Sequence, residues 1–254
     1  MRRCLFALCA LLSLAAPLRS AAEPVGTSPS FKGPVGLQLY SLRNQFKQQG
    51  AAALDFAKEQ GFVEVEIGLE NHYGLTPEAM KEALDALGLK PIAALASLDF
   101  LLKQTDKAVT EARRFGVRHV GVAWAPHKKP LDEPQLLKIA EGFNQAGKLL
   151  KEQGLQFFYH NHGFEFVPHQ DGTLFDLLVR KTDPDLVKFE MDVLWTLHPG
   201  QDPVALLKKY PDRWVLMHLK DLRKGITGDL SGGTALENDV PLGSGQANYP
   251  AILK

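Results

Sequence analysis

Residues 155–165, Leu-Gln-Phe-Phe-Tyr-His-Asn-His-Gly-Phe-Glu, decide the fold class of this chain. They join a short apolar run to polar side chains that can bind metals or transfer protons. Two later stretches have the same form: 186–192 ends in Glu190-Met191-Asp192, and 214–221 ends in His218-Leu219-Lys220-Asp221. Apolar runs of this length predict buried strands, so we expect each polar group at the end of a strand.

On either side, the chain alternates short apolar runs with longer amphipathic stretches. Predicted strands lie at 35–40, 62–67, 89–96, 118–123, 155–159, 186–189 and 214–217, and predicted helices at 51–60, 76–88, 101–115, 133–153, 174–180 and 203–210. Capping residues support the helices: Thr76-Pro77-Glu78 is typical of a helix start, and Gly88 of a helix end. Strand–helix repetition predicts an α/β fold with a parallel sheet and helices outside it.

The number of strands favours a (β/α)8 TIM-type barrel over an open, doubly wound sheet. No glycine-rich phosphate loop follows an early strand, which also argues against a dinucleotide-binding fold. The barrel is expected to span 34–254. The sequence ends at Lys254, in what we expect to be the helix after the seventh strand, so the barrel is predicted to be truncated there.

The first residues have the features of a targeting segment. Arg2-Arg3, an apolar stretch to Ala16 and the small residues Ser20-Ala21-Ala22 predict a signal peptide over 1–22, with an uncleaved anchor as the alternative. A linker is expected at 23–33. The protein is therefore predicted to be exported, to the periplasm or beyond, with no integral membrane span after cleavage. Both cysteines lie inside the predicted signal peptide, so the mature chain is expected to carry no thiol chemistry.

The composition limits the partners. The chain has 29 Lys+Arg and 29 Asp+Glu residues, for a net charge of zero, and it contains no basic block. We therefore expect no nucleic acid partner. A homo-oligomer is compatible with the sequence.

The strand-end residues predict a single site. In such barrels the active site lies at the carboxyl ends of the strands, and residues two apart on a strand share a face. His160, Asp192 and His218 are therefore expected to lie together. Imidazole and carboxylate ligands suit a divalent metal such as Mn²⁺, Zn²⁺, Co²⁺ or Fe²⁺. A polar pocket without a metal is the alternative.

Several motifs give the chain a family resemblance. They are 36–43 (GLQLYSLR), 61–66 (GFVEVE), 160–166 (HNHGFEF), 189–195 (FEMDVLW), 218–221 (HLKD) and 243–245 (GSG). From about Pro34 to its end, the chain resembles the xylose isomerase-like barrels, the superfamily of sugar isomerases, epimerases and family-2 apurinic endonucleases. Its motifs are most similar to the sugar phosphate isomerase/epimerase branch.

The resemblance implies a divalent metal held by carboxylates and a histidine at the strand ends. Asp192 and His218 match two of these ligands, and His160 occupies the position of a third. Glu165 is an alternative ligand or the catalytic base. The fourth ligand of the family is a glutamate on an eighth strand, which is not expected in this chain.

The implied chemistry is proton transfer next to the carbonyl of a sugar or keto-sugar. An isomerase or epimerase is the first hypothesis. A lyase, dehydratase or glycoside hydrolase is the second, and a non-catalytic sugar-binding barrel the third. The residues assigned to catalysis are Glu165 and Lys220, and those assigned to the substrate are His162, Glu190, Asp221, Glu66 and Trp195.

Each role has an alternative. Lys220 and Asp221 could instead form a surface ion pair, and Glu190 could orient a metal ligand from behind. Glu66 could be a solvated loop carboxylate. Trp195 and Tyr40 could form a wall for a sugar ring or belong to the core. The histidines at 72, 127, 169 and 198 are expected in loops.

Overall fold

The structure is a computed structural model that describes residues 24–26, 31 and 33–254. The predicted signal peptide at 1–22 and most of the predicted linker at 23–33 lie outside the described residues, so both stay predictions. Among the described residues, no helix combines the length and the apolar character needed to cross a membrane.

The main sheet has seven parallel strands in the order β1-β2-β3-β4-β5-β8-β9. Their bounds are β1 Leu37–Gln38, β2 Glu64–Gly68, β3 Lys90–Ala96, β4 His119–Val122, β5 Gln156–His160, β8 Val187–Asp192 and β9 Trp214–His218. The order confirms the α/β, TIM-type barrel fold. Within the described residues β1 and β9 do not pair with each other, so the seven-stranded barrel is open between them.

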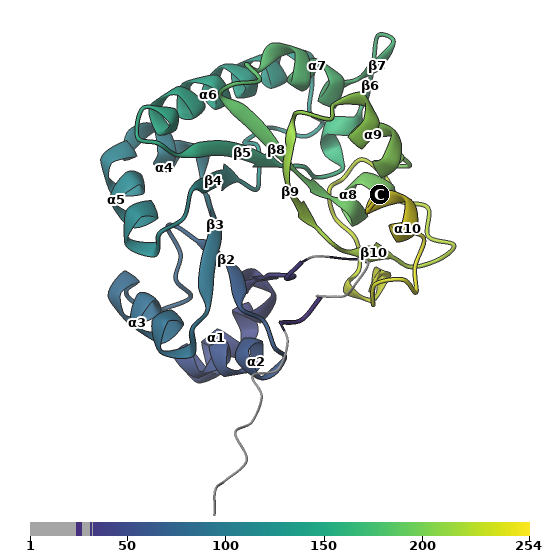
Figure 1. Cartoon of the computed structure of the whole chain (residues 1–254). Helices are drawn as coiled ribbons and strands as arrows, with labels where there is room; N and C mark the ends of the chain where they lie inside the picture. Colours follow the sequence, from purple (N-terminus) through teal and green to yellow (C-terminus); the bar gives the residue numbers. More distant parts are fainter. Residues whose placement is uncertain (1–23, 27–30, 32) are drawn as a thin grey trace, which may run out of the picture.

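The helices lie on the outer side of the curved sheet (Figure 1). They are α1 Arg43–Gln49, α2 Ala53–Glu59, α3 Pro77–Leu87, α4 Leu98–Lys103, α5 Thr105–Phe115, α6 Glu133–Lys151, α7 Leu174–Lys181, α8 Val193–Leu197, α9 Pro203–Lys209 and α10 Tyr249–Ile252. Short 3-10 helices occur at η1 Leu39–Leu42, η2 Gly50–Ala52, η3 Phe164–Phe166 and η4 Leu236–Asn238. Two small antiparallel pairs complete the fold: β6 Pro168–His169 with β7 Gly172–Thr173, and β10 Asp221–Leu222 with β11 Asp239–Val240.

Local chemistry explains several boundaries. The Thr76 hydroxyl accepts a hydrogen bond from the backbone N–H of Ala79 and begins α3, and Gly88, with φ +65°, ends it. The predicted helix over 101–115 is in fact two helices. Its first part begins earlier, because the Ser97 hydroxyl caps α4, and the backbone leaves helical geometry at Gln104 before α5 begins. The predicted strand over 35–40 is only two residues long, because η1 begins at Leu39.

The barrel interior is filled just below the strand ends. Gly121 on β4 pairs in register with Phe158 on β5. A side-chain Cβ atom at Gly121 would lie 2.6 Å from the Phe158 ring, so only glycine leaves room for this ring. Phe158 and His160 share one face of β5, because they are two residues apart. The packed phenylalanine therefore forms a floor beneath the histidine.

Candidate metal centre and active site

Three neighbouring strands bring the predicted ligands together. Register pairs His160 on β5 with Glu190 on β8, and Asp192 on β8 with His218 on β9. Ligand atoms of His160, Asp192 and His218 all lie within 4.8 Å of one another. The strand-end reasoning therefore placed these three residues in one cluster, at the carboxyl face of the barrel.

The two carboxylate oxygens of Asp192 have different surroundings. Its Oδ1 atom accepts a hydrogen bond of 3.0 Å from the backbone N–H of Trp195 and so caps α8. Its backbone N–H donates to Oδ1 of Asn161, which fixes the end of the strand. Its Oδ2 atom is buried and has no hydrogen-bond partner. It lies 3.6 Å from Nε2 of His160 and 3.7 Å from Nδ1 of His218.

The opposite edges of both imidazole rings contact carboxylates. Nδ1 of His160 lies 3.0 Å from Oε2 of Glu190, and Nε2 of His218 lies 3.3 Å from Oε1 of Glu190. Nε2 of His218 also lies 3.2 Å from Oε1 of Glu66. A metal-binding histidine usually donates its second N–H to such an acceptor, which orients the ring. Glu190 and Glu66 therefore support the two histidines, and the substrate-binding role expected for them stays a prediction.

Burial and neighbouring charges set the protonation states. Burial lowers the pKa of His160 well below its ordinary value, and the positive charge of His218 lowers it further. Burial also acts to lower the pKa of His218, but the Glu66 and Glu190 carboxylates outweigh it and raise that pKa well above its ordinary value. Burial acts to raise the pKa of Asp192, but Lys220 and His218 hold it well below its usual range. Asp192 is therefore an ionised carboxylate in the interior.

The donor set fits a divalent metal. The ionised, buried Oδ2 atom of Asp192 makes no hydrogen bond, and a divalent cation shared with two imidazole nitrogens would stabilise it further than the ion pair with Lys220 does. Glu66, Glu190 and His218 form a second, overlapping group of donors. We favour the group of His160, Asp192 and His218, because one nitrogen of each ring faces the buried Oδ2 atom of Asp192, which the other choice leaves out. That other choice would also use the carboxylates that orient the rings.

Lys220 adds a charge beside the cluster. Its Nζ atom lies 2.9 Å from Oδ2 of Asp192, as an ion pair outside hydrogen-bond geometry. Burial acts to lower the pKa of Lys220, but the Asp192 carboxylate outweighs it and raises that pKa. The ammonium group is therefore protonated at neutral pH and can stabilise negative charge. The alternative surface ion pair between Lys220 and Asp221 does not form, because Lys220 pairs with Asp192 and the Asp221 side chain is fully buried.

The structure corrects the role expected for Asp221. Its carboxylate is fully buried and accepts hydrogen bonds from the backbone N–H groups of Gly243, Gly245 and Ala247. It therefore holds the 243–247 turn in place and is not available to a substrate.

The structure also corrects the role expected for Glu165. The side chain has no exposed surface; it accepts hydrogen bonds from the Tyr159 hydroxyl and from the backbone N–H of His162. Burial raises its pKa to about 7, against the opposing effect of these donors. Glu165 supports the turn after β5, and it lies outside both groups of candidate metal ligands.

His162 lies at the edge of the cluster, among aromatic rings. Its ring centroid is 5.0 Å from that of His160, 5.0 Å from that of Trp124 and 5.7 Å from that of Trp195. Its Nδ1 atom is buried without a hydrogen-bond partner. Burial lowers the pKa of His162 to about 4, so the ring is neutral at neutral pH. It is a free imidazole beside the candidate metal ligands.

Sequence reasoning missed Trp124 and His127, in the loop after β4. Trp124 is 44% exposed, and its ring stacks on His127 with centroids 5.6 Å apart. Together with His162 and Trp195 they form an aromatic wall at the carboxyl ends of the barrel strands. The sequence offered one signal for this wall, because Trp124 directly follows the predicted strand over 118–123. Tyr40, by contrast, is 55% exposed, so it is not a core residue.

The fold and the site define a (β/α) barrel with a metal-type donor cluster at the carboxyl ends of its strands. The chain belongs to the xylose isomerase-like TIM barrel family, whose model matches residues 54–254. This agrees with the resemblance carried by the sequence motifs.

Similar proteins differ in the reactions for which they are named. An inosose dehydratase of Clostridium perfringens (strain 13 / Type A) is 32% identical over 184 residues, which cover 65% of this chain and 61% of that enzyme. The chain thus spans less than two thirds of that relative's length. A sugar phosphate isomerase/epimerase structure from Parabacteroides distasonis ATCC 8503 matches with a TM-score of 0.68 and 27% identity, covering 86% of this chain and 80% of that one. The IOLI protein with a bound zinc atom matches with a TM-score of 0.61 and 14% identity, over 85% and 81% of the two chains.

Proposed function

We propose that this protein is a divalent-metal-dependent enzyme that removes a proton next to the carbonyl group of a keto-sugar or keto-polyol and then eliminates water. One observation carries the proposal. Both histidines turn one ring nitrogen toward the buried Oδ2 atom of Asp192 and the other toward Glu190. This is the arrangement of metal ligands with a supporting carboxylate behind them. The dehydratase relative supports the elimination of water.

The proposed roles follow from charge and position. His160, Asp192 and His218 would hold the metal, and the zinc-bound relative supports a divalent ion in this fold. A divalent cation supplies polarisation of a carbonyl oxygen, which acidifies the neighbouring C–H bond. Lys220 stabilises negative charge on the substrate oxygen and supplies the proton that turns the departing hydroxyl into water.

We assign proton abstraction to His162 in place of Glu165. The His162 ring is neutral, lies 5.0 Å from the His160 ring and has an Nδ1 atom without a hydrogen-bond partner, whereas both oxygens of Glu165 accept hydrogen bonds from the protein. Trp124 and Trp195 provide apolar faces for the substrate ring.

An isomerase or epimerase is the second candidate, supported by the similar structure from Parabacteroides distasonis. Both reactions begin with the same proton abstraction, and they differ in whether the proton returns or water leaves. Export, a small-molecule sugar substrate and a homo-oligomer remain part of the proposal.

The test uses the full chain loaded with Mn²⁺ and incubated with inosose and with free ketoses in D₂O. Loss of water, followed by mass spectrometry, supports the dehydratase. Deuterium uptake next to the carbonyl without loss of water supports the isomerase instead. A metal-loaded protein that catalyses neither reaction on any of these compounds contradicts both candidates, and the Asp192→Asn variant serves as the inactive control.

A further inference from the structure

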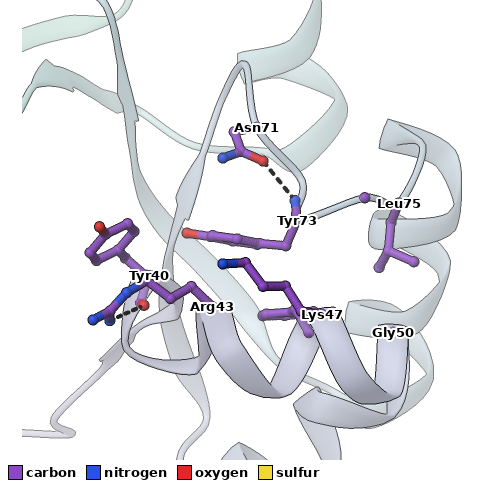
Figure 2. Close-up of a pocket in the computed structure, with 9 residues that line it drawn as sticks. Tyr40, Arg43, Lys47, Gly50, Asn71, Tyr73 and Leu75 are labelled. Atoms are coloured by element: carbon purple, nitrogen blue, oxygen red, sulfur yellow. Dashed lines mark hydrogen bonds between the residues drawn. The ribbon is translucent and has the colours of Figure 1, made fainter.

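A hollow opens on the same side of the barrel as the metal centre. It is a pocket of about 780 Å³ between the segment that follows β1 and the segment that follows β2. Tyr40, Arg43 and Lys47 line it from the first segment, and Asn71 and Tyr73 line it from the second (Figure 2). Both segments begin at the carboxyl ends of their strands, the end at which barrel active sites lie.

Strand pairing connects this pocket to the metal centre. Gln38, the last residue of β1, pairs in register with Glu66 on β2. Glu66 contacts His218 at 3.2 Å, and Tyr40 follows Gln38 by two residues. The pocket is therefore a neighbour of the cluster along the rim of the barrel. Tyr73 in the pocket is close enough to Glu66 for the Glu66 charge to act on the Tyr73 hydroxyl.

The pocket carries positive charge that no acidic side chain of its lining neutralises. Arg43 and Lys47 line it, and none of its lining residues is acidic. Among the described residues, neither side chain forms a salt bridge. The Arg43 guanidinium is held in place: it donates to the backbone carbonyl of Tyr40 at 2.9 Å and lies over the Tyr40 ring at 4.4 Å. This leaves donor groups of Arg43 free for a ligand, because a guanidinium carries five N–H donors.

Tyr73 is held rigidly at the far side of the pocket. It has φ +56°, an unfavourable backbone conformation for a non-glycine residue. Its backbone N–H donates to Oδ1 of Asn71 at 2.9 Å, and its ring stacks on Phe46 with centroids 4.7 Å apart. Figure 2 shows its hydroxyl end and the Lys47 ammonium pointing toward the side where Tyr40 and Arg43 lie. Burial and the charge of Glu66 raise the pKa of Tyr73, so its hydroxyl remains a hydrogen-bond donor.

We propose that this pocket is a substrate subsite for an anionic substituent, a carboxylate or a phosphate ester, on the sugar whose carbonyl group lies at the metal centre. Arg43 and Lys47 bind the anion, and Tyr73 donates a hydrogen bond to it. This inference rests on the proposed function, since it assumes a sugar at the cluster. It adds that the preferred sugar is an acid or a phosphate rather than a neutral one.

The experiment measures binding directly, by titration calorimetry of the full chain with Mn²⁺ present. The probes are D-glucuronate, D-glucose 6-phosphate and neutral D-glucose. We expect at least one of the anionic sugars to bind about tenfold or more tightly than glucose, since the charge-assisted hydrogen bonds that Arg43 and Lys47 can make pair opposite charges with an anion and not with a neutral hydroxyl. Which of the two binds more tightly identifies the anion as a carboxylate or a phosphate. In 1 M salt the preference should shrink.

Two variants test the residues. Arg43→Gln with Lys47→Gln should abolish the preference for anionic sugars, whereas Lys58→Gln, an exposed lysine on α2, should leave it unchanged. Lys47→Gln alone should weaken it; Lys47 is exposed, so this variant should fold even where the double variant does not. The proposal is overturned if neither anionic sugar binds more tightly than glucose, or if the folded variants keep the preference.

The Asp192→Asn variant separates this proposal from the proposed function. It should lose Mn²⁺ and still prefer the anionic sugar, because the pocket lies outside the ligand cluster. A wild-type chain that binds no metal but discriminates between the sugars would refute the metal enzyme and support the subsite. A wild-type chain that binds metal but does not discriminate between the sugars would support the metal enzyme and refute the subsite.

Discussion

The ammonium group of Lys220 lies 2.9 Å from Oδ2 of Asp192, the same oxygen that both candidate histidine ligands approach. Lys220 and a metal ion would therefore share one carboxylate oxygen, and their like charges oppose each other. This relationship links the proposed acid of the reaction to the proposed metal site.

Replacing Lys220 separates these two roles. Lys220→Met should reduce turnover by about 100-fold or more, because it removes the stabilising charge and the proton donor. Mn²⁺ affinity should stay equal or increase, because no ammonium competes for Oδ2. Calorimetry with Mn²⁺ and steady-state kinetics measure the two effects, with Lys224→Met, an exposed lysine after β10, as the control. Loss of metal binding in Lys220→Met would contradict the proposed arrangement.

The two carboxylates of β8 should differ in their effect on metal binding. Asp192→Asn should abolish it, since Asp192 supplies a ligand atom. Glu190→Gln should weaken it by about 10- to 100-fold, the usual effect of losing a carboxylate that orients a ligand. Metal content and calorimetry on both purified variants provide the measurement. If Glu190→Gln abolishes binding while Asp192→Asn retains it, the ligands are Glu66, Glu190 and His218 instead.

Glu165 should make the protein less stable at alkaline pH. Its pKa is raised from 4.5 to about 7 in the folded protein, so folding favours the protonated form. The resulting contribution to stability is complete below pH 4.5, and it is lost as pH rises through about 7. The difference corresponds to about 3 kcal/mol.

Urea unfolding between pH 5 and pH 8.5 measures this effect. Glu165→Gln should flatten the pH dependence, because glutamine resembles the protonated acid, whereas the exposed Glu152→Gln should leave the slope as in the wild type. An unchanged slope in Glu165→Gln would show that another group causes it.

The floor of the site should not tolerate a larger residue at Gly121. Gly121→Ala places a methyl group 2.6 Å from the Phe158 ring, and we expect a loss of about 1–3 kcal/mol in the free energy of unfolding. The added substitution Phe158→Leu should recover part of the loss. Thermal unfolding is the measurement, and Gly233→Ala, with no close neighbour for its methyl group, is the control. A fully stable Gly121→Ala protein would contradict the packing described here.

The sequence predicted the fold through local patterns. Apolar runs and helix caps located all seven strands of the main sheet, because strand burial and capping depend mainly on neighbouring residues. The predicted boundaries of strands and helices were wrong where the backbone geometry depends on packing, as at η1 and at Gln104 between α4 and α5.

The sequence predicted that His160, Asp192 and His218 lie close together, and the physical reason is simple. Parallel strands carry their carboxyl ends to one edge, and alternation then assigns side chains to one face. Which atoms face each other was decided only by the tertiary structure. Glu190 contacts the outer edge of both histidine rings, and Glu165 and Asp221 turn into the protein to bind backbone N–H groups.

The sequence by itself thus determined the barrel and the three strand-end residues, since both follow from short-range periodicity. The tertiary structure alone decided the aromatic wall around Trp124 and the cationic pocket beside Tyr73. Both arise where loops from different strands meet, and such contacts depend on chain segments far apart in sequence, which no local pattern records.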